Sequence, residues 1–115
     1  MYHGSCHCNN IQFTVDAPIT QVMECNCSHC SRKGFLLTML PSTQVTVQNI
    51  TTPLSRYLFH KHEIMHDFCP TCGVQCFATG INPADGSQVF AVNVRTLTDI
   101  DVASLEVLPV DGKSL

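Results

Sequence analysis

Apolar and polar residues alternate along most of the chain, which is the two-residue period of half-buried β-strands. Ile11, Phe13 and Val15 give the clearest alternation, and Val45 and Val47 repeat it further along. The same pattern predicts strands at residues 22–25, 35–40, 56–59, 63–68, 74–79 and 89–94.

Turn-forming residues separate these segments, at Pro18, Pro41, Pro53 and in the loop 81–87. No window of a dozen residues carries a helical stripe, and the only helical turn we expect lies at residues 102–105. The pattern therefore predicts a single mainly β domain over residues 1–115 with roughly eight to ten short strands.

Composition narrows the class of protein. Of 115 residues, 44% are hydrophobic and 13% charged, which is typical of a compact globule. The net charge of −3 and the absence of a basic run argue against nucleic acid as a partner. No apolar run is long enough to cross a membrane, and the N-terminus MYHGSCHC lacks a signal-peptide pattern. We expect a cytoplasmic protein with a small-molecule partner, and the oligomeric state is left open.

Eight cysteines dominate the candidate chemistry. In a reducing compartment they indicate metal ligands or reactive thiols rather than disulfides. Seven of them fall into short motifs and one stands alone: Cys6 and Cys8; Cys25, Cys27 and Cys30; Cys69 and Cys72; and the isolated Cys76.

The segment FCPTCG, residues 68–73, is typical of a zinc knuckle. Its proline stiffens the turn, and Gly73 permits the positive φ that lets backbone N–H groups point at the sulfurs. A knuckle supplies two ligands and needs a second pair. Either the CHC motif or two cysteines of CNCSHC can provide it, and spacing does not choose between them. Two pairs make a closed structural site, and the remaining three cysteines make a site one ligand short.

Other interpretations compete with this one. The cysteine pairs can be unrelated buried residues, and Cys76 alternates along a strand as a small core residue would. The three cysteines of CNCSHC can also form a second closed site, completed by His29, His66 or Cys76. His66 is equally suited to be a core residue or a hydrogen-bond partner of a metal ligand.

The three motifs GSCHC, CNCSHC and HDFCPTCG, taken in this order, resemble the glutathione-dependent formaldehyde-activating enzyme family, which includes centromere protein V. The resemblance extends through AVNVRTL to VDGKSL and covers nearly the whole chain. It implies a β-tent fold of small antiparallel sheets with zinc-binding knuckles. It also implies a carbon–sulfur lyase that acts on S-hydroxymethylglutathione, the adduct of glutathione and formaldehyde.

The resemblance further implies two zinc ions per chain, with glutathione as cosubstrate. A structural zinc would be held by Cys6, Cys8, Cys69 and Cys72. A catalytic zinc with an open position would be held by Cys25, Cys27 and Cys30. As anchors for the carboxylates of glutathione we consider Arg32, Lys33 and Arg95.

The sequence departs from the family pattern at three places. Asn9 follows the CHC pair where glycine is usual, and asparagine tolerates the same left-handed backbone. Ser31 stands between the third cysteine and Arg32, where the family often has a basic residue. Cys76 occupies a position where proline or serine is commoner.

A second hypothesis from a different class remains open. The chain can be a non-catalytic zinc β-module that binds a partner, with both zinc ions structural. Four protein ligands on each zinc would favour that module, whereas three on the second would favour the enzyme.

Overall fold

The computed structural model describes residues 1–114, and Leu115, the last residue of VDGKSL and of the expected domain, lies outside the described residues. The described chain contains one short α-helix, α1, at Ser28–Lys33. The strands are β1 (Tyr2–Ser5), β2 (Ile11–Val15), β3 (Gln21–Cys25), β4 (Leu37–Pro41), β5 (Val45–Ile50), β6 (Ser55–Tyr57), β7 (His66–Phe68), β8 (Phe77–Ile81), β9 (Gln88–Asn93) and β10 (Glu106–Val110). Short 3₁₀ helices are η1 (Ser42–Gln44), η2 (Val94–Thr96), η3 (Val102–Ser104) and η4 (Gly112–Ser114).

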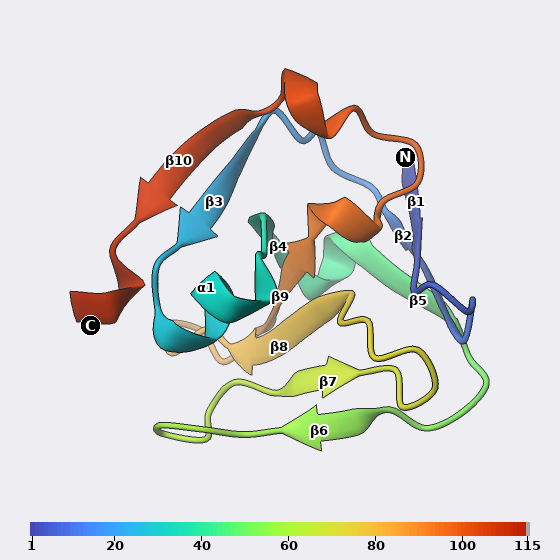
Figure 1. The fold of residues 1–115 in the computed structure, drawn as a ribbon, viewed down its shortest axis with the longest axis horizontal. Helices are drawn as coiled ribbons and strands as arrows, with labels where there is room; N and C mark the ends of the chain where they lie inside the picture. The colour runs from blue at the N-terminus through green and yellow to red at the C-terminus, as the bar shows by residue number, and fades with distance from the viewer. Residues whose placement is uncertain (115) are drawn as a thin grey trace.

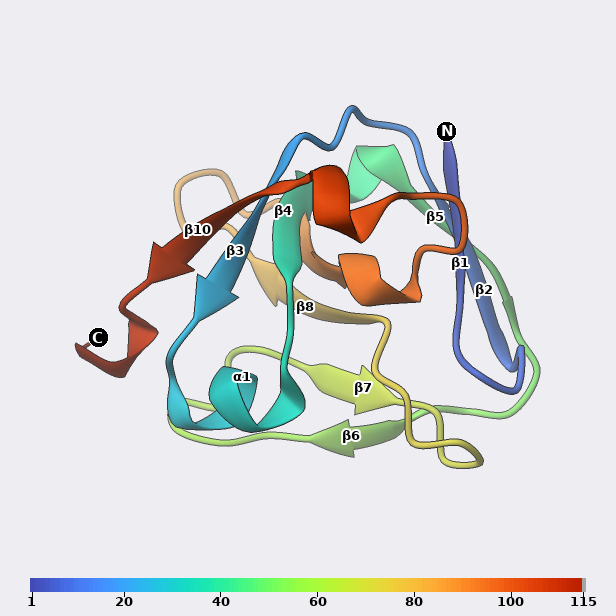
Figure 2. The same ribbon diagram turned by 45° about the horizontal axis from the view of Figure 1, so that its top comes forward.

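The strands form three small sheets (Figure 1). β1, β2 and β5 form an antiparallel sheet, and β6 pairs with β7. The largest sheet has the order β10-β3-β4-β9-β8. Helix α1 lies between the end of β3 and the β6–β7 pair, as the turned view shows (Figure 2). No helix among residues 1–114 is long and apolar enough to cross a membrane.

The alternation in the sequence places one face of each larger sheet in a shared core. Ile11, Phe13 and Val15 are almost fully buried on β2. Phe13 packs edge-on against Phe77 of β8, with ring centroids 5.7 Å apart, and Phe77 packs in the same way against Phe90 of β9, at 5.1 Å. Such edge-to-face contacts add to the apolar area that the rings bury.

The expected fold class is confirmed, since the chain is mainly β with small sheets and cysteine clusters able to bind zinc. Most expected strands are present with shifted ends, but residues 63–65 lie outside β7 and contribute only an isolated bridge between Met65 and Thr79. β1, β10 and α1 were not expected. The helical turn expected at 102–105 is η3.

One strand pair differs from the antiparallel expectation. β10 runs parallel to β3, with Val110 opposite Cys25. Because both strands run in the same direction, the loops that follow them leave the sheet at the same edge. This brings the C-terminal residues 111–114 next to the CNCSHC loop, some eighty residues earlier in the chain.

The close packing of β1 against β2 gives a test of this core. A methyl group added at buried Gly4 would overlap the ring of Phe13. We expect Gly4→Ala to lower the free energy of unfolding by about 1–3 kcal/mol, the usual cost of overpacking. Urea unfolding followed by circular dichroism measures it.

Gly80→Ala is the matched control, because the nearest atom to the added carbon is Ile64 Cγ1, at an ordinary 3.8 Å. Equal stabilities for Gly4→Ala and the parent protein would contradict the packing of β1 on Phe13.

Candidate metal centre

The fold gathers seven of the eight cysteines into two clusters. The first contains Cys6, Cys8, Cys69 and Cys72, and the second contains Cys25, Cys27 and Cys30. Within each cluster the sulfur atoms all lie within 4.8 Å of one another. All eight cysteines are free thiols.

The four-thiol cluster has the dimensions of a tetrahedral zinc site. Cys6 Sγ lies 3.8 Å from Cys8 Sγ, and Cys8 Sγ lies 3.5 Å from Cys69 Sγ. Four sulfurs placed tetrahedrally at the usual zinc–sulfur distance of about 2.3 Å would be about 3.8 Å apart. The residues present therefore fit a closed zinc site.

Backbone N–H groups point at these sulfurs. Ile11 N–H donates to Cys6 Sγ at 3.3 Å, and Cys72 N–H donates to Cys69 Sγ at 3.5 Å. Burial opposes ionisation of Cys69, but the N–H groups of Cys72 and Thr71 outweigh it and lower the pKa of this thiol to about 6. The turn thus favours the thiolate form that a metal requires.

The knuckle turns have the backbone that the sequence predicted. Gly73 has φ 80°, and Asn9 has φ 64°. Both values lie in the left-handed region that glycine and asparagine tolerate. Asn9 therefore keeps the turn that glycine usually makes at this place.

Asn10 is a residue of this site that sequence reasoning missed. Its buried side-chain amide donates to Cys69 Sγ at 3.6 Å and to the Thr52 carbonyl at 3.0 Å. It therefore ties the four-thiol cluster to the segment after β5. The pair of asparagines after CHC was the only signal in the sequence.

The three-thiol cluster is built on the start of α1. Cys27 is the N-cap of this helix, and its Sγ accepts a hydrogen bond from Cys30 N–H at 3.2 Å. Burial opposes ionisation of Cys27, but the N–H groups of Cys30 and His29 lower the pKa of its thiol. Burial and the sulfur of Cys27 raise the pKa of Cys30.

The three residues considered as a fourth ligand lie elsewhere. Among residues 1–114, the group around Cys25, Cys27 and Cys30 contains no other His, Cys, Asp or Glu. The His29 ring packs between Tyr57 and His66, with centroids at 5.8 and 4.3 Å. Cys76 lies in the hydrophobic core.

The C-terminal segment closes one side of this cluster, which the sequence did not reveal. Asn26 donates from Nδ2 to Asp111 Oδ1 and accepts from Lys113 N–H, both at 2.9 Å. Gly112 lies so close to Cys25 that an added Cβ would overlap Cys25 Sγ. Only glycine fits here without moving the loop.

A cavity of about 610 Å³ adjoins the three-thiol cluster. Cys25 and Cys30 lie in its wall, together with the charged residues Glu24, Arg95 and Asp111. Arg95 donates from Nε to the Gly34 carbonyl at 3.2 Å, which holds the guanidinium in the cavity wall. Of the predicted carboxylate anchors, Arg95 is the one that shares a cavity with the sulfurs.

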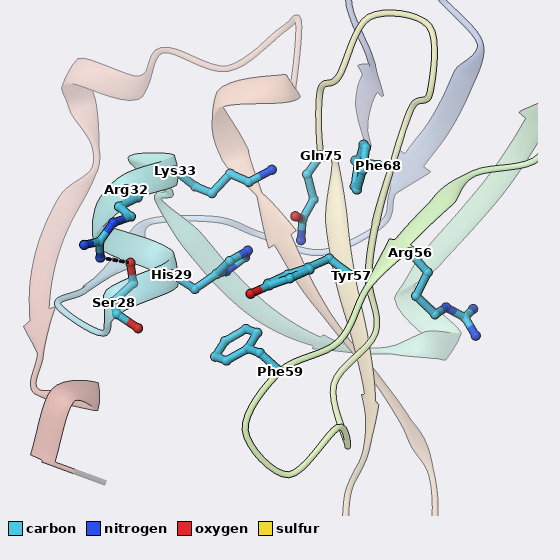
Figure 3. A pocket seen from close by; sticks show the side chains of 9 residues that line it. All are labelled: Ser28, His29, Arg32, Lys33, Arg56, Tyr57, Phe59, Phe68 and Gln75. Carbon is cyan, nitrogen blue, oxygen red and sulfur yellow. Dashed lines mark hydrogen bonds between the residues drawn. The ribbon is translucent and has the colours of Figure 1, made fainter.

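Arg32 and Lys33 line a different cavity, of about 780 Å³, whose wall contains no cysteine (Figure 3). His29, Tyr57 and Phe59 supply aromatic rings to it. Arg32 Nη1 donates to the Ser28 carbonyl at 2.8 Å, and Lys33 Nζ lies over the Phe68 ring at 5.3 Å from its centroid. The helix thus turns these two cations away from the cavity of Cys25 and Cys30.

Two comparisons with known proteins bear on this arrangement. The family described as glutathione-dependent formaldehyde-activating enzyme matches residues 1–107. The crystal structure of a Rhodobacter sphaeroides protein is similar at 25% sequence identity with a TM-score of 0.77. That similarity covers 93% of this chain and 97% of the other.

The two clusters join residues at very different separations along the chain, and this difference gives a second test. Structural zinc contributes about 10–16 kcal/mol in peptides, comparable to or above the 5–15 kcal/mol stability of a whole domain. We expect Cys72→Ser to leave most of the chain unfolded, since this cluster joins residues 61 positions apart. Cys27→Ser should lower the free energy of unfolding less, because the three cysteines of the second cluster lie within one short segment of chain.

Circular dichroism measures how much of each variant is folded, and elemental analysis measures its zinc content. We expect two zinc ions in the parent protein and one in folded Cys27→Ser. Equal loss of structure in the two variants would mean that the clusters do not divide into a structural and a chemical site.

Proposed function

Because the chain belongs to the glutathione-dependent formaldehyde-activating enzyme family, we propose that it makes and breaks the carbon–sulfur bond between a thiol such as glutathione and an aldehyde such as formaldehyde. The observation that carries this proposal is the three-thiol cluster, which has no fourth protein ligand among residues 1–114 and borders a cavity with a cation. Its free thiols suit a reducing compartment such as the cytoplasm.

The donor set of the second cluster fits zinc, with Cys25, Cys27 and Cys30 as the residues that would hold it. With these three residues as its protein ligands, such a zinc ion would leave one position for a ligand from outside the chain and would favour the ionised form of a thiol there. A free thiol with a pKa near 8.5 is only a few per cent ionised at neutral pH, so full ionisation raises the reactive fraction roughly 30-fold. A thiolate of lower pKa is a weaker nucleophile, which takes back part of this gain.

The cavity wall offers complementary charges for glutathione. Glutathione has two carboxylates and one ammonium group. Arg95 can pair with a carboxylate, and Glu24 can pair with the ammonium group. Asp111 already accepts hydrogen bonds from Asn26 and Ser114, so its role is to hold the loop rather than the substrate.

The reaction itself is balanced without an oxidant or a reductant. The thiol loses its proton, sulfur bonds to the aldehyde carbon, and the carbonyl oxygen takes up a proton to become a hydroxyl. The lyase direction reverses each change. Holding the two reactants in one cavity adds a proximity contribution to the ionisation effect.

Glutathione binding provides the direct test of the site. We expect glutathione to bind with release of about one proton near neutral pH, because only the thiolate ligates zinc. Arg95→Ala should weaken binding about tenfold or more, the value of a charge-assisted hydrogen bond. Calorimetric titration in two buffers of different ionisation heat measures both quantities.

Arg32→Ala is the matched control for this titration. Its guanidinium lines the other cavity and already donates to Ser28, so we expect a smaller loss of affinity. Binding without proton release, or no binding, would favour the partner-binding zinc module instead.

Catalysis needs its own measurement, since thiols add to formaldehyde unaided. We expect the parent protein to accelerate exchange between formaldehyde and S-hydroxymethylglutathione above the uncatalysed rate. Folded Cys27→Ser should lose this acceleration. Magnetisation-exchange NMR at equilibrium follows both directions, and an unchanged exchange rate with zinc-loaded protein would exclude the lyase.

A further inference from the structure

A third, smaller cavity also borders Cys30. Its volume is about 140 Å³, and Cys30 and Phe35 line it as well as the cavity of Arg95. The rest of its wall is mostly apolar, with Leu37, Met39, Ile64 and Phe77 among the contributors. Cys30 therefore lies in the wall of two cavities, one with charged residues and one that is mostly apolar.

An apolar groove continues this cavity toward the surface. The groove has a volume of about 670 Å³ and shares Met39, Ile64, Ala78 and Ala91 with the cavity. Met39 and Ile64 are 53% and 52% exposed, so apolar side chains border the mouth of the groove.

Strand register explains why the sheet is hollowed here. Met39 of β4 lies opposite Ala91 of β9, and Ala91 lies opposite Ala78 of β8. These residues share the sheet face that points away from the core, because side chains directly opposite each other point the same way. Two adjacent alanines leave a depression where larger residues would fill the surface.

We propose that the site acts on thiol adducts of apolar aldehydes longer than formaldehyde, with the alkyl chain lying in the cavity behind Cys30 and in the adjoining groove. This inference rests on the proposed function. The thiol part of the adduct occupies the cavity of Arg95, and the aldehyde part occupies the apolar side. Formaldehyde has no chain and needs none of this space, whereas an apolar cavity of about 150 Å³ is large enough for a benzene ring.

Gln75 is a buried polar residue in the wall of this cavity and also of the cavity of Arg32 and Lys33, and its amide matches the hydroxyl of such an adduct. Gln75 is only 4% exposed, and its Oε1 has no hydrogen-bond partner among the described residues. Its Nε2 donates to the Phe77 carbonyl at 3.4 Å, which fixes the orientation of the amide. The free acceptor is costly to leave unpaired, and a hemithioacetal hydroxyl is a donor that can satisfy it.

The test uses S-methyl-, S-butyl- and S-hexylglutathione as unreactive probes, titrated calorimetrically into zinc-loaded protein. We expect affinity to rise about fourfold for each methylene that enters the apolar cavity, so that S-butyl binds at least about tenfold tighter than S-methyl. Ala91→Leu fills the depression, and it should remove most of the difference between the probes. Ala103→Leu makes the same change at an exposed alanine of η3 and should leave the series unchanged.

The parent series decides the question even if Ala91→Leu folds poorly. Equal affinities for the three probes would overturn the inference, while turnover of formaldehyde would still uphold the proposed function. If affinity rises with chain length but no aldehyde is turned over, the proposed function is rejected, and the cavity and groove still bind the alkyl part of the probes. The three probes can also bind equally to a protein that is a dimer and that Met39→Glu dissociates. That result would assign the groove to a second copy of the chain and would also overturn the inference.

Discussion

The four-thiol cluster is the constraint on which the other parts of the site depend. It joins the end of β1 to the turn after β7. His66 begins β7, and Gln75 lies two residues after the knuckle, so holding Cys69 and Cys72 also places these two side chains. Both line the cavity behind Cys30. A metal bound at the first cluster therefore shapes a wall of the second site without contacting it.

The second cluster has the opposite character, because it depends on local structure that is weak by itself. A helix of six residues is far too short to be stable alone. Here Cys27 Sγ caps its first turn, and Gly34 ends it with φ 69° and an N–H bond to the Cys30 carbonyl. The His29 ring packs the first turn of the helix against Phe59 and His66. Since the capping atom is itself a candidate ligand, metal binding and helix formation stabilise each other.

The sequence predicted the strands with a regular period and the motifs of neighbouring residues. It did not reveal contacts between residues far apart in the chain. Alternation identified β2 and β5, and motif spacing identified the three cysteine groups. Helix α1 shows no apolar stripe because it is held by a thiol cap and by ring contacts. The roles of Asn10, Asn26 and Gly112 depend on residues 42 to 87 positions away, which no local pattern reveals.

The basic residues show the same limit. Arg32 and Lys33 follow Cys30 closely in sequence, which made them natural candidates for contact with a ligand at the second cluster. A helix, however, turns successive residues by about 100°, and these two face the cavity of Tyr57 instead. Arg95, 65 positions after Cys30 in the numbering, reaches the sulfur side because η2 follows β9 next to β4. Closeness along the chain was therefore a poor guide to closeness in space.

Comparison of Cys76 with Cys69 shows what the knuckle turn does to the pKa of a buried thiol. Cys69 and Cys76 are both completely buried, yet burial raises the pKa of Cys76 to about 12, whereas that of Cys69 falls to about 6. The difference comes from the knuckle turn, which directs N–H groups of Cys72 and Thr71 at Cys69. Cys76 lies just before β8, outside any such turn. The knuckle turn thus separates these two buried thiols, and the C-P-x-C spacing predicts the pair at Cys69 and Cys72 because it encodes that turn.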